Sequence, residues 1–149
     1  MIETYPNPWN FENNDGKLFS NDKSYRIVYS ELREIGMGAP LAGDSYFENA
    51  NQKVKIHNFC GGPGLWETNG NLLAIPIWIN IFFKGTVQRI GVFDVKSNEL
   101  KIYSKIFNVL DLRTFEKNMI YGYDSPIYKT KTVSFDVDKE KIKMIIKLK

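Results

Sequence analysis

The sequence predicts an all-β protein made of repeated antiparallel units within one domain. Two patterns each recur three times along the 149 residues, and β-branched and aromatic residues dominate the apolar stretches between them. Such residues favour strands, and no stretch shows a sustained helical period with caps at its ends. A chain of this length can bury one core. We therefore expect residues 1–149 to form a single β-rich domain.

The first pattern places an aromatic and an acidic residue ahead of a polar turn and a new strand. Its copies are "FENANQKVKI" from Phe47, "FDVKSNELKI" from Phe93 and "FDVDKEKIKM" from Phe135. A strand end, a polar turn and a second strand indicate a β-hairpin. We expect Asp94 and Asp136 to cap two of these turns.

The second pattern runs in step with the first. Its copies, "LFSNDKSYRIV" from Leu18, "LWETNGNLLAI" from Leu65 and "LRTFEKNMIYG" from Leu112, begin 47 residues apart. Together the patterns define units at about 16–62, 63–109 and 110–149, after an N-terminal extension, residues 1–15. Within each unit we expect a short strand, a turn, a long strand, a loop, a strand, a turn and a final strand.

Four antiparallel strands in a unit of about 40–50 residues match a β-propeller blade. The run "WETNGNLLAI" (66–75), followed by "IGVFDVKSNELKIY" (90–103), resembles the W-x-x-D-G-x-x-[IL]-A-[FI] run and hairpin of bacterial propeller blades. Asn69 stands where that run usually has Asp, and the other two copies lack the Trp and the Gly. The resemblance implies three propeller-like units, as a closed monomeric ring or as a half-ring that forms a homodimer. An antiparallel β-sandwich or meander is the alternative.

The charge is uneven along the chain. Residues 1–75 hold nine acids and six bases, and residues 76–149 hold eight acids and fourteen bases. The C-terminal lysines alternate with Ile142, Met144, Ile146 and Leu148, which predicts a strand with one apolar face. Without an interleaved aromatic platform, we expect no nucleic-acid partner.

The compartment is predicted from what the sequence lacks. A single cysteine cannot form an internal disulfide, the first residues do not form an export leader, and "LLAIPIWINIFF" (72–83) is too short to span a bilayer. We therefore expect a cytoplasmic protein with no membrane partner.

One stretch, "HNFCGGPGLWETNGNLLAIPIW" (57–78), holds the only histidine and the only cysteine. Along a strand, His57 and Cys60 point to opposite faces unless a bulge intervenes, so we expect both to be structural. The glycines of "CGGPG" are followed by a strand instead of a helix, which indicates a joint with positive φ and close packing. We expect Trp78 to lie in the core. One His and one Cys cannot hold zinc and no calcium loop is present, so we expect no metal, no cofactor and no catalytic residue.

The absence of catalytic residues favours a binding protein. As a small single-domain β-protein with uneven charge and no catalytic residues, the chain is similar in type to the small cytoplasmic immunity proteins of bacterial toxin systems. Those proteins bind and block a cognate toxin. The resemblance implies a toxin domain as partner, and many nuclease toxins are basic because they bind phosphates. We expect acidic loops and an aromatic anchor to contact it, through Trp9, Asp22, Glu31, Glu34, Asp44, Trp66 and Glu67.

Two alternatives remain open. A small-ligand binder or enzyme would use a pocket at the mouth of the propeller, lined by Gly36, Gly38, Asp44, Tyr46, His57, Cys60 and Asp124. A structural module would form one stable homomer and bind nothing else.

Overall fold

The computed structural model describes residues 6–127 and 129–148 and confirms the antiparallel all-β class. The described residues contain no α-helix. The elements in chain order are the 3₁₀ turn η1 (Gly16–Leu18) and the strands β1 (Arg26–Glu34), β2 (Leu41–Glu48), β3 (Lys53–Cys60), β4 (Leu65–Trp66), β5 (Leu72–Ile81), β6 (Gly85–Asp94), β7 (Glu99–Tyr103), β8 (Leu110–Glu116), β9 (Met119–Asp124), β10 (Lys131–Asp136) and β11 (Ile142–Lys147).

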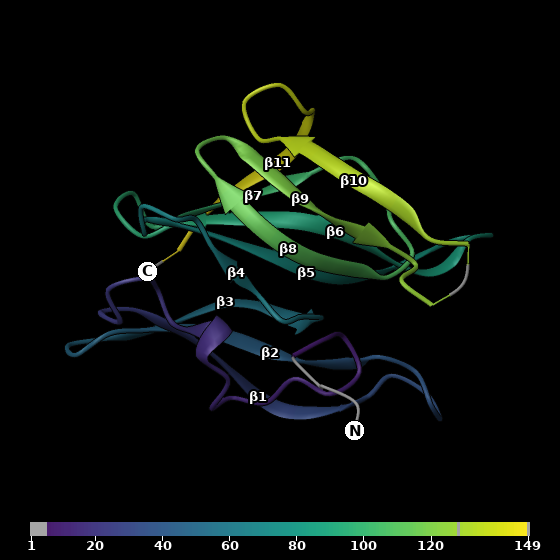
Figure 1. Ribbon diagram of the computed structural model, residues 1–149, viewed down its shortest axis with the longest axis horizontal. Coiled ribbons are helices and arrows are strands. Elements are labelled where there is room, and N and C mark those ends of the chain that lie inside the picture. The colour runs from purple at the N-terminus through teal and green to yellow at the C-terminus, as the bar shows by residue number, and fades with distance from the viewer. Residues whose placement is uncertain (1–5, 128, 149) are drawn as a thin grey trace.

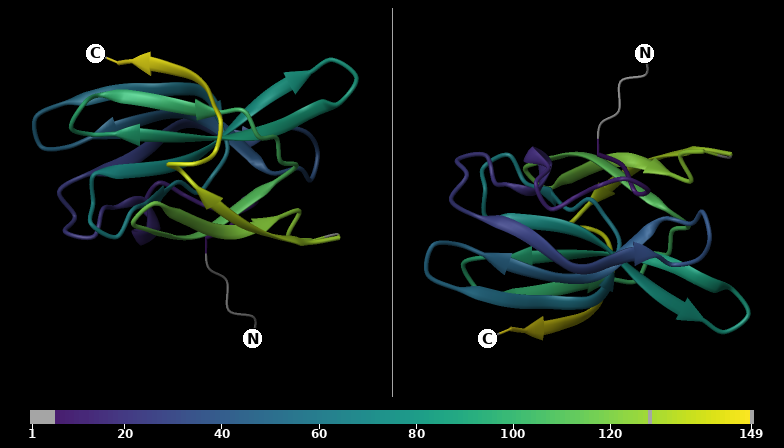
Figure 2. Two further views of the ribbon diagram at one scale, coloured as in Figure 1. Left: turned by 90° about the horizontal axis from the view of Figure 1, so that it is seen from above. Right: turned by 90° about the horizontal axis from the view of Figure 1, so that it is seen from below.

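The strands form two sheets. The first has the order β1-β2-β3-β5-β6-β7-β11, with β4 also paired to β5, and the second has the order β10-β9-β8. Figure 1 shows β1–β3 below β5–β7, and Figure 2 shows β8–β10 set apart from the strands of the first sheet.

Two hydrophobic clusters form the core, and β5–β7 contribute to both. In β5, Leu73 and Ile75 pack with β1–β3, whereas Ala74 packs with β8–β10. In β6, Phe93 packs with β1–β3, and Val92 packs with β8–β10. Side chains of a strand alternate between the faces of its sheet, so strands covered on both faces need a nearly continuous apolar run. This requirement explains the long apolar stretch of β5.

The strand order predicted for the repeats is present, but the structure does not confirm a three-bladed propeller. The second unit contains β4–β7, the third contains β8–β11, and in the first an isolated bridge between Phe19 and Arg26 precedes β1–β3. Neither sheet formed by the described residues closes into a ring. Instead β3 of the first unit and β11 of the third pair with β5 and β7 of the second. The physical reason is that the second unit offers a free strand edge at β7, and β11 pairs there instead of beside β10.

The repeat period also brings equivalent turns together. The side-chain amide of Asn21 donates to the carbonyl oxygen of Thr68 over 3.4 Å. The backbone N–H of Thr68 donates to the carbonyl oxygen of Phe115 over 2.9 Å. These three positions are separated by 47 residues each, so the periodicity found in the sequence corresponds to contacts between the units.

The C-terminal strand is present as expected, but its apolar face is only partly covered. Ile146 packs against the core, whereas Ile142 and Met144 are exposed. The pairing of β11 with β7 shifts register between Ile142 and Met144. This irregularity, together with the position of β11 at the sheet edge, leaves apolar side chains in solvent.

Candidate functional site

Three register shifts occur side by side on β1, β2 and β3. The β1–β2 ladder shifts after Ser30, and the β2–β3 ladder shifts on either side of Ser45, which faces His57. Glu31 and Phe59 lie within the shifted segments, and each has φ = 55°. Positive φ is uncommon outside glycine, and β-bulges redirect side chains relative to the sheet. This segment therefore presents side chains that a regular strand would not present.

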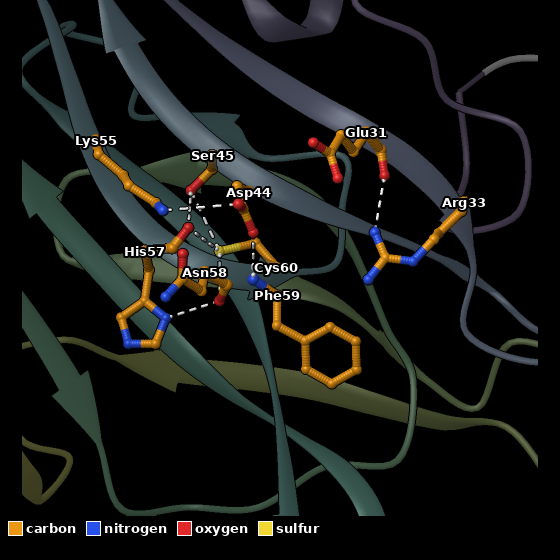
Figure 3. Close-up of polar contacts among 9 residues, drawn as sticks. All are labelled: Glu31, Arg33, Asp44, Ser45, Lys55, His57, Asn58, Phe59 and Cys60. Carbon is orange, nitrogen blue, oxygen red and sulfur yellow. Dashed lines mark hydrogen bonds and ion pairs between the residues drawn. The ribbon is translucent and has the colours of Figure 1, made fainter.

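Beneath these bulges lies a buried pair of small polar side chains (Figure 3). The Cys60 Sγ lies 3.2 Å from the Ser45 Oγ, and both residues are fully buried. The Ser45 Oγ also lies 3.4 Å from the carbonyl oxygen of His57. Burial raises the pKa of the Cys60 thiol to about 12, so the group is protonated at neutral pH. Because the thiolate is the reactive form, this cysteine is not an activated nucleophile.

His57 is held by its own strand and not by the cysteine. Its Nδ1 donates to the carbonyl oxygen of Asn58 over 2.8 Å. Figure 3 shows the imidazole pointing away from the Cys60 sulfur. The described hydrogen bonds include none between the imidazole and the thiol. The bulge does change the alternation along β3, but it does not create a thiol–imidazole pair.

Asp44 holds the bulge that contains Phe59. Its Oδ1 accepts the backbone N–H of Phe59 over 3.2 Å, and its Oδ2 lies 3.6 Å from the Lys55 Nζ. On the neighbouring strand, the Arg33 Nη1 donates to the carbonyl oxygen of Glu31 over 3.1 Å. We name these outward-facing groups the bulge surface, which consists of Glu31, Arg33, Asp44, Lys55, His57, Asn58 and Phe59.

The structure gathers some of the predicted partner-binding residues. Glu31, Glu34 and Asp44 lie along the same part of the β1–β2 ladder, because Ser30 pairs with Asp44 and Glu34 pairs with Leu41. Trp9 is half-buried in a segment anchored beside them, since the carbonyl oxygen of Pro8 accepts the Leu41 N–H.

The other predicted partner-binding residues lie elsewhere. Asp22 is exposed in the turn before β1, at the end of that strand opposite Glu34. Trp66 is buried, and its Nε1 donates to the carbonyl oxygen of Leu18 over 2.9 Å. Glu67 is also buried. Trp66 is therefore a core residue, which corrects its assignment as a surface anchor, and Glu67 offers little surface to a partner.

The residues expected at a propeller mouth do not line one pocket. Asp44, Tyr46 and His57 lie on β2 and β3, and Gly36 and Gly38 lie in the turn that joins β1 to β2. Cys60 is buried beneath the surface. Asp124 ends β9 in the other sheet, where its carboxylate accepts the N–H groups of residues 108 and 109.

The glycine-rich stretch is a packed joint, as expected. An added Cβ would lie 2.5 Å from the Tyr29 hydroxyl at Gly62 and 3.1 Å from the Ile27 side chain at Gly64. Gly61 is equally crowded. The expectation of positive φ here is wrong, because the described glycines with positive φ are Gly38, Gly70 and Gly85. Close packing is the reason that these positions are glycine.

Several residues of the bulge surface escaped sequence reasoning, notably Phe59, Asn58 and Arg33. The available signal was a break in alternation. Val54, Ile56 and Cys60 are buried, but Asn58, which lies between Ile56 and Cys60 and would share their face in a regular strand, is exposed. A polar, exposed residue where alternation requires a buried one indicates an irregularity in the strand.

Within the described residues, no group of three or more His, Cys, Asp or Glu side chains could hold a metal ion. The same part of the chain contains no helix of the length and apolarity needed to cross a membrane. No family model matches the sequence, and neither a curated protein nor a solved structure matches it.

Proposed function

We propose that this chain is a non-catalytic binding protein that recognises a protein partner through the bulge surface, in the manner of a small cytoplasmic immunity protein. The observation that carries the proposal is the set of adjacent bulges on β1–β3. They present charged, amide and aromatic side chains on a hydrogen-bonded sheet, while the single thiol lies buried below. Side chains of mixed polarity around an aromatic group are typical of protein interfaces.

The charges of this surface suggest which partner it fits. Asp44 faces Lys55, and Arg33 lies two residues from Glu31, so the surface is not uniformly acidic. Glu31 of this surface and Glu34, which ends β1 beside it, are exposed and have no ion pair among the described residues. Complementarity to a basic toxin domain therefore depends mainly on these two carboxylates, which would raise the association rate and the specificity.

Phe59 supplies the apolar part of the contact. Its ring is partly exposed, and its backbone is held by Asp44. A side chain on a fixed backbone loses little freedom on binding, which favours its use as an anchor. A toxin domain docked here would have its active site covered by the outer face of β1–β3.

The first experiment is capture of tagged protein from its native cells, with the bound partner identified and then purified. We expect one stoichiometric toxin domain. With that partner, E31K/E34K should bind at least about tenfold more weakly at low salt, because rim charges act mainly on association. Phe59→Asn removes the ring but tolerates positive φ, and should increase the dissociation rate. Asp22→Lys, at the other end of β1, is the matched control. Unchanged affinity of both E31K/E34K and Phe59→Asn would contradict the proposal.

A further inference from the structure

The most exposed large apolar side chains of the described residues occupy the same turn in each repeat. Met37 is 102% exposed, Phe82 82%, Phe83 93% and Ile127 74%. They lie in the turns after β1, β5 and β9, which join the second and third strands of the three units. Figures 1 and 2 show these three turns at one end of the molecule. Isolated exposed apolar residues are ordinary, but this arrangement repeats in all three units.

The turn between β5 and β6 is the clearest of the three. The hairpin remains paired as far as Ile81 and Gly85, and Figure 2 shows it projecting beyond the neighbouring strands. The rings of Phe82 and Phe83 contact each other, with centroids 4.0 Å apart. Phe83 has φ = 73°, an uncommon conformation for a bulky side chain. These rings cover no core, so packing within the fold does not explain them.

Cations accompany two of the tips. Lys84 directly follows Phe83, and Lys131 lies close behind Ile127. Lys105 and Lys131 line the same hollow beside β10, of about 350 Å³. All three lysines are exposed.

Carboxylates at this end lie beside the turns after β9 and β1. Near the β9 turn the carboxylate is Asp124, which accepts two backbone N–H groups. The turn after β1 has mixed charge, since Arg33 lies between Glu31 and Glu34. The two tips after β5 and β9 are therefore apolar and basic, and Met37 adds a third apolar tip at the same end.

We propose that this end of the molecule docks on an anionic lipid bilayer. We name it the tip surface, defined by Met37, Phe82, Phe83, Lys84, Ile127 and Lys131. The apolar side chains enter the interfacial region of the bilayer, and the lysines face lipid phosphates. This docking needs no membrane-spanning segment, and it differs from the expectation of no membrane partner.

The separation of the three turns that form the tip surface favours a lipid bilayer over a protein as its binding partner. A protein partner would need a matched pocket for each tip, whereas a fluid bilayer accepts all of them together. The inference does not depend on the proposed partner, because it concerns the ends of the hairpins and not the outer face of β1–β3.

The test is co-sedimentation of the purified full chain with phosphatidylcholine vesicles, with and without about one-third phosphatidylglycerol. Wild-type protein should bind the anionic vesicles, bind the neutral ones more weakly, and dissociate as salt rises. F82S/F83N should weaken binding by about tenfold or more, because two large apolar groups no longer enter the bilayer. Asn at position 83 tolerates the positive φ of the turn.

The matched control is M144S/I145S, which removes exposed apolar side chains from β11. It should bind as wild type does, and circular dichroism should show both double variants folded. In F83W, brominated lipids should quench the added fluorescence if the tip enters the bilayer. Absence of wild-type binding to anionic vesicles would overturn the proposal. Equal binding by F82S/F83N and wild type would overturn it as well, since the contact would then lie elsewhere, for example on the lysines of β11.

Discussion

Replacement of Tyr29 by Phe tests whether the glycine-rich joint holds the fold together. The Tyr29 hydroxyl is buried, donates to the carbonyl oxygen of Gly61 over 2.8 Å and accepts the N–H of Gly64 over 3.1 Å. The phenylalanine ring keeps the contact with Phe11, whose centroid lies 4.8 Å away. The substitution therefore removes two hydrogen bonds and little packing.

The expected loss follows from the two backbone groups left behind. Each becomes a buried polar group without a partner, which costs about 1–3 kcal/mol, so the free energy of unfolding should fall by about 2–6 kcal/mol. In a domain of this size, 1 kcal/mol lowers Tm by about 2–4 °C, which gives a fall in Tm of roughly 10 °C.

Urea unfolding followed by tryptophan fluorescence measures the change, with Tyr121→Phe as the control. Tyr121 is exposed, so its variant should stay within about 0.5 kcal/mol of wild type. A Tyr29→Phe protein as stable as that control would refute the view that this hydroxyl joins β1 to the segment between β3 and β4.

Three further predictions concern packing, thiol reactivity and a turn carboxylate. Gly122→Ala places a Cβ 2.3 Å from a carbonyl oxygen of β8 and should lower the free energy of unfolding by about 1–3 kcal/mol in urea. Gly16→Ala, which has open space around the added Cβ, is the control and should leave the free energy of unfolding unchanged. Cys60 should react with a thiol reagent at pH 8 only as fast as the protein unfolds, and rapid reaction without denaturant would contradict its burial. Burial raises the Cys60 pKa from 9.0 to about 12, so the folded state favours the protonated thiol. The stability that this thiol contributes is present below pH 9 and should be lost as the pH rises toward 12. Alkaline unfolding of wild type and of Cys60→Ser would measure the difference. The hydrogen bond from the Asn118 side chain lowers the pKa of Asp136, so Asn118→Ala should raise that pKa in an NMR titration. The stability that the Asp136 carboxylate contributes is present above its usual pKa of 3.8 and is lost as the pH falls through its pKa in the folded protein.

Much of the secondary structure could be predicted from local patterns. Asp94 and Asp136 cap their turns as expected, since each Oδ1 accepts a backbone N–H two residues further on. Trp78 is buried as expected. These features depend on neighbours in the chain, so a single sequence contains the information that specifies them.

The candidate site was less predictable. Glu31 and Asp44 were expected to be accessible, but their grouping depends on the pairing of β1 with β2. The exposure of Phe59 depends on a bulge held by Asp44, fifteen residues away. Trp66 was expected to be an aromatic anchor for a partner, yet η1 supplies the carbonyl oxygen that its indole N–H needs in the core. Contacts between distant segments decided these cases.

The sequence by itself determined the β class, the threefold repeat of strands and turns, and the contrast between apolar strands and polar turns, because alternation and turn residues act locally. The tertiary structure alone decided that β11 pairs with β7 and that the units share a sheet. It also decided that the turns after β1, β5 and β9 lie at one end of the molecule (Figure 1). A strand edge can pair with any compatible edge that the chain brings near it, and a local pattern does not specify which edge that is.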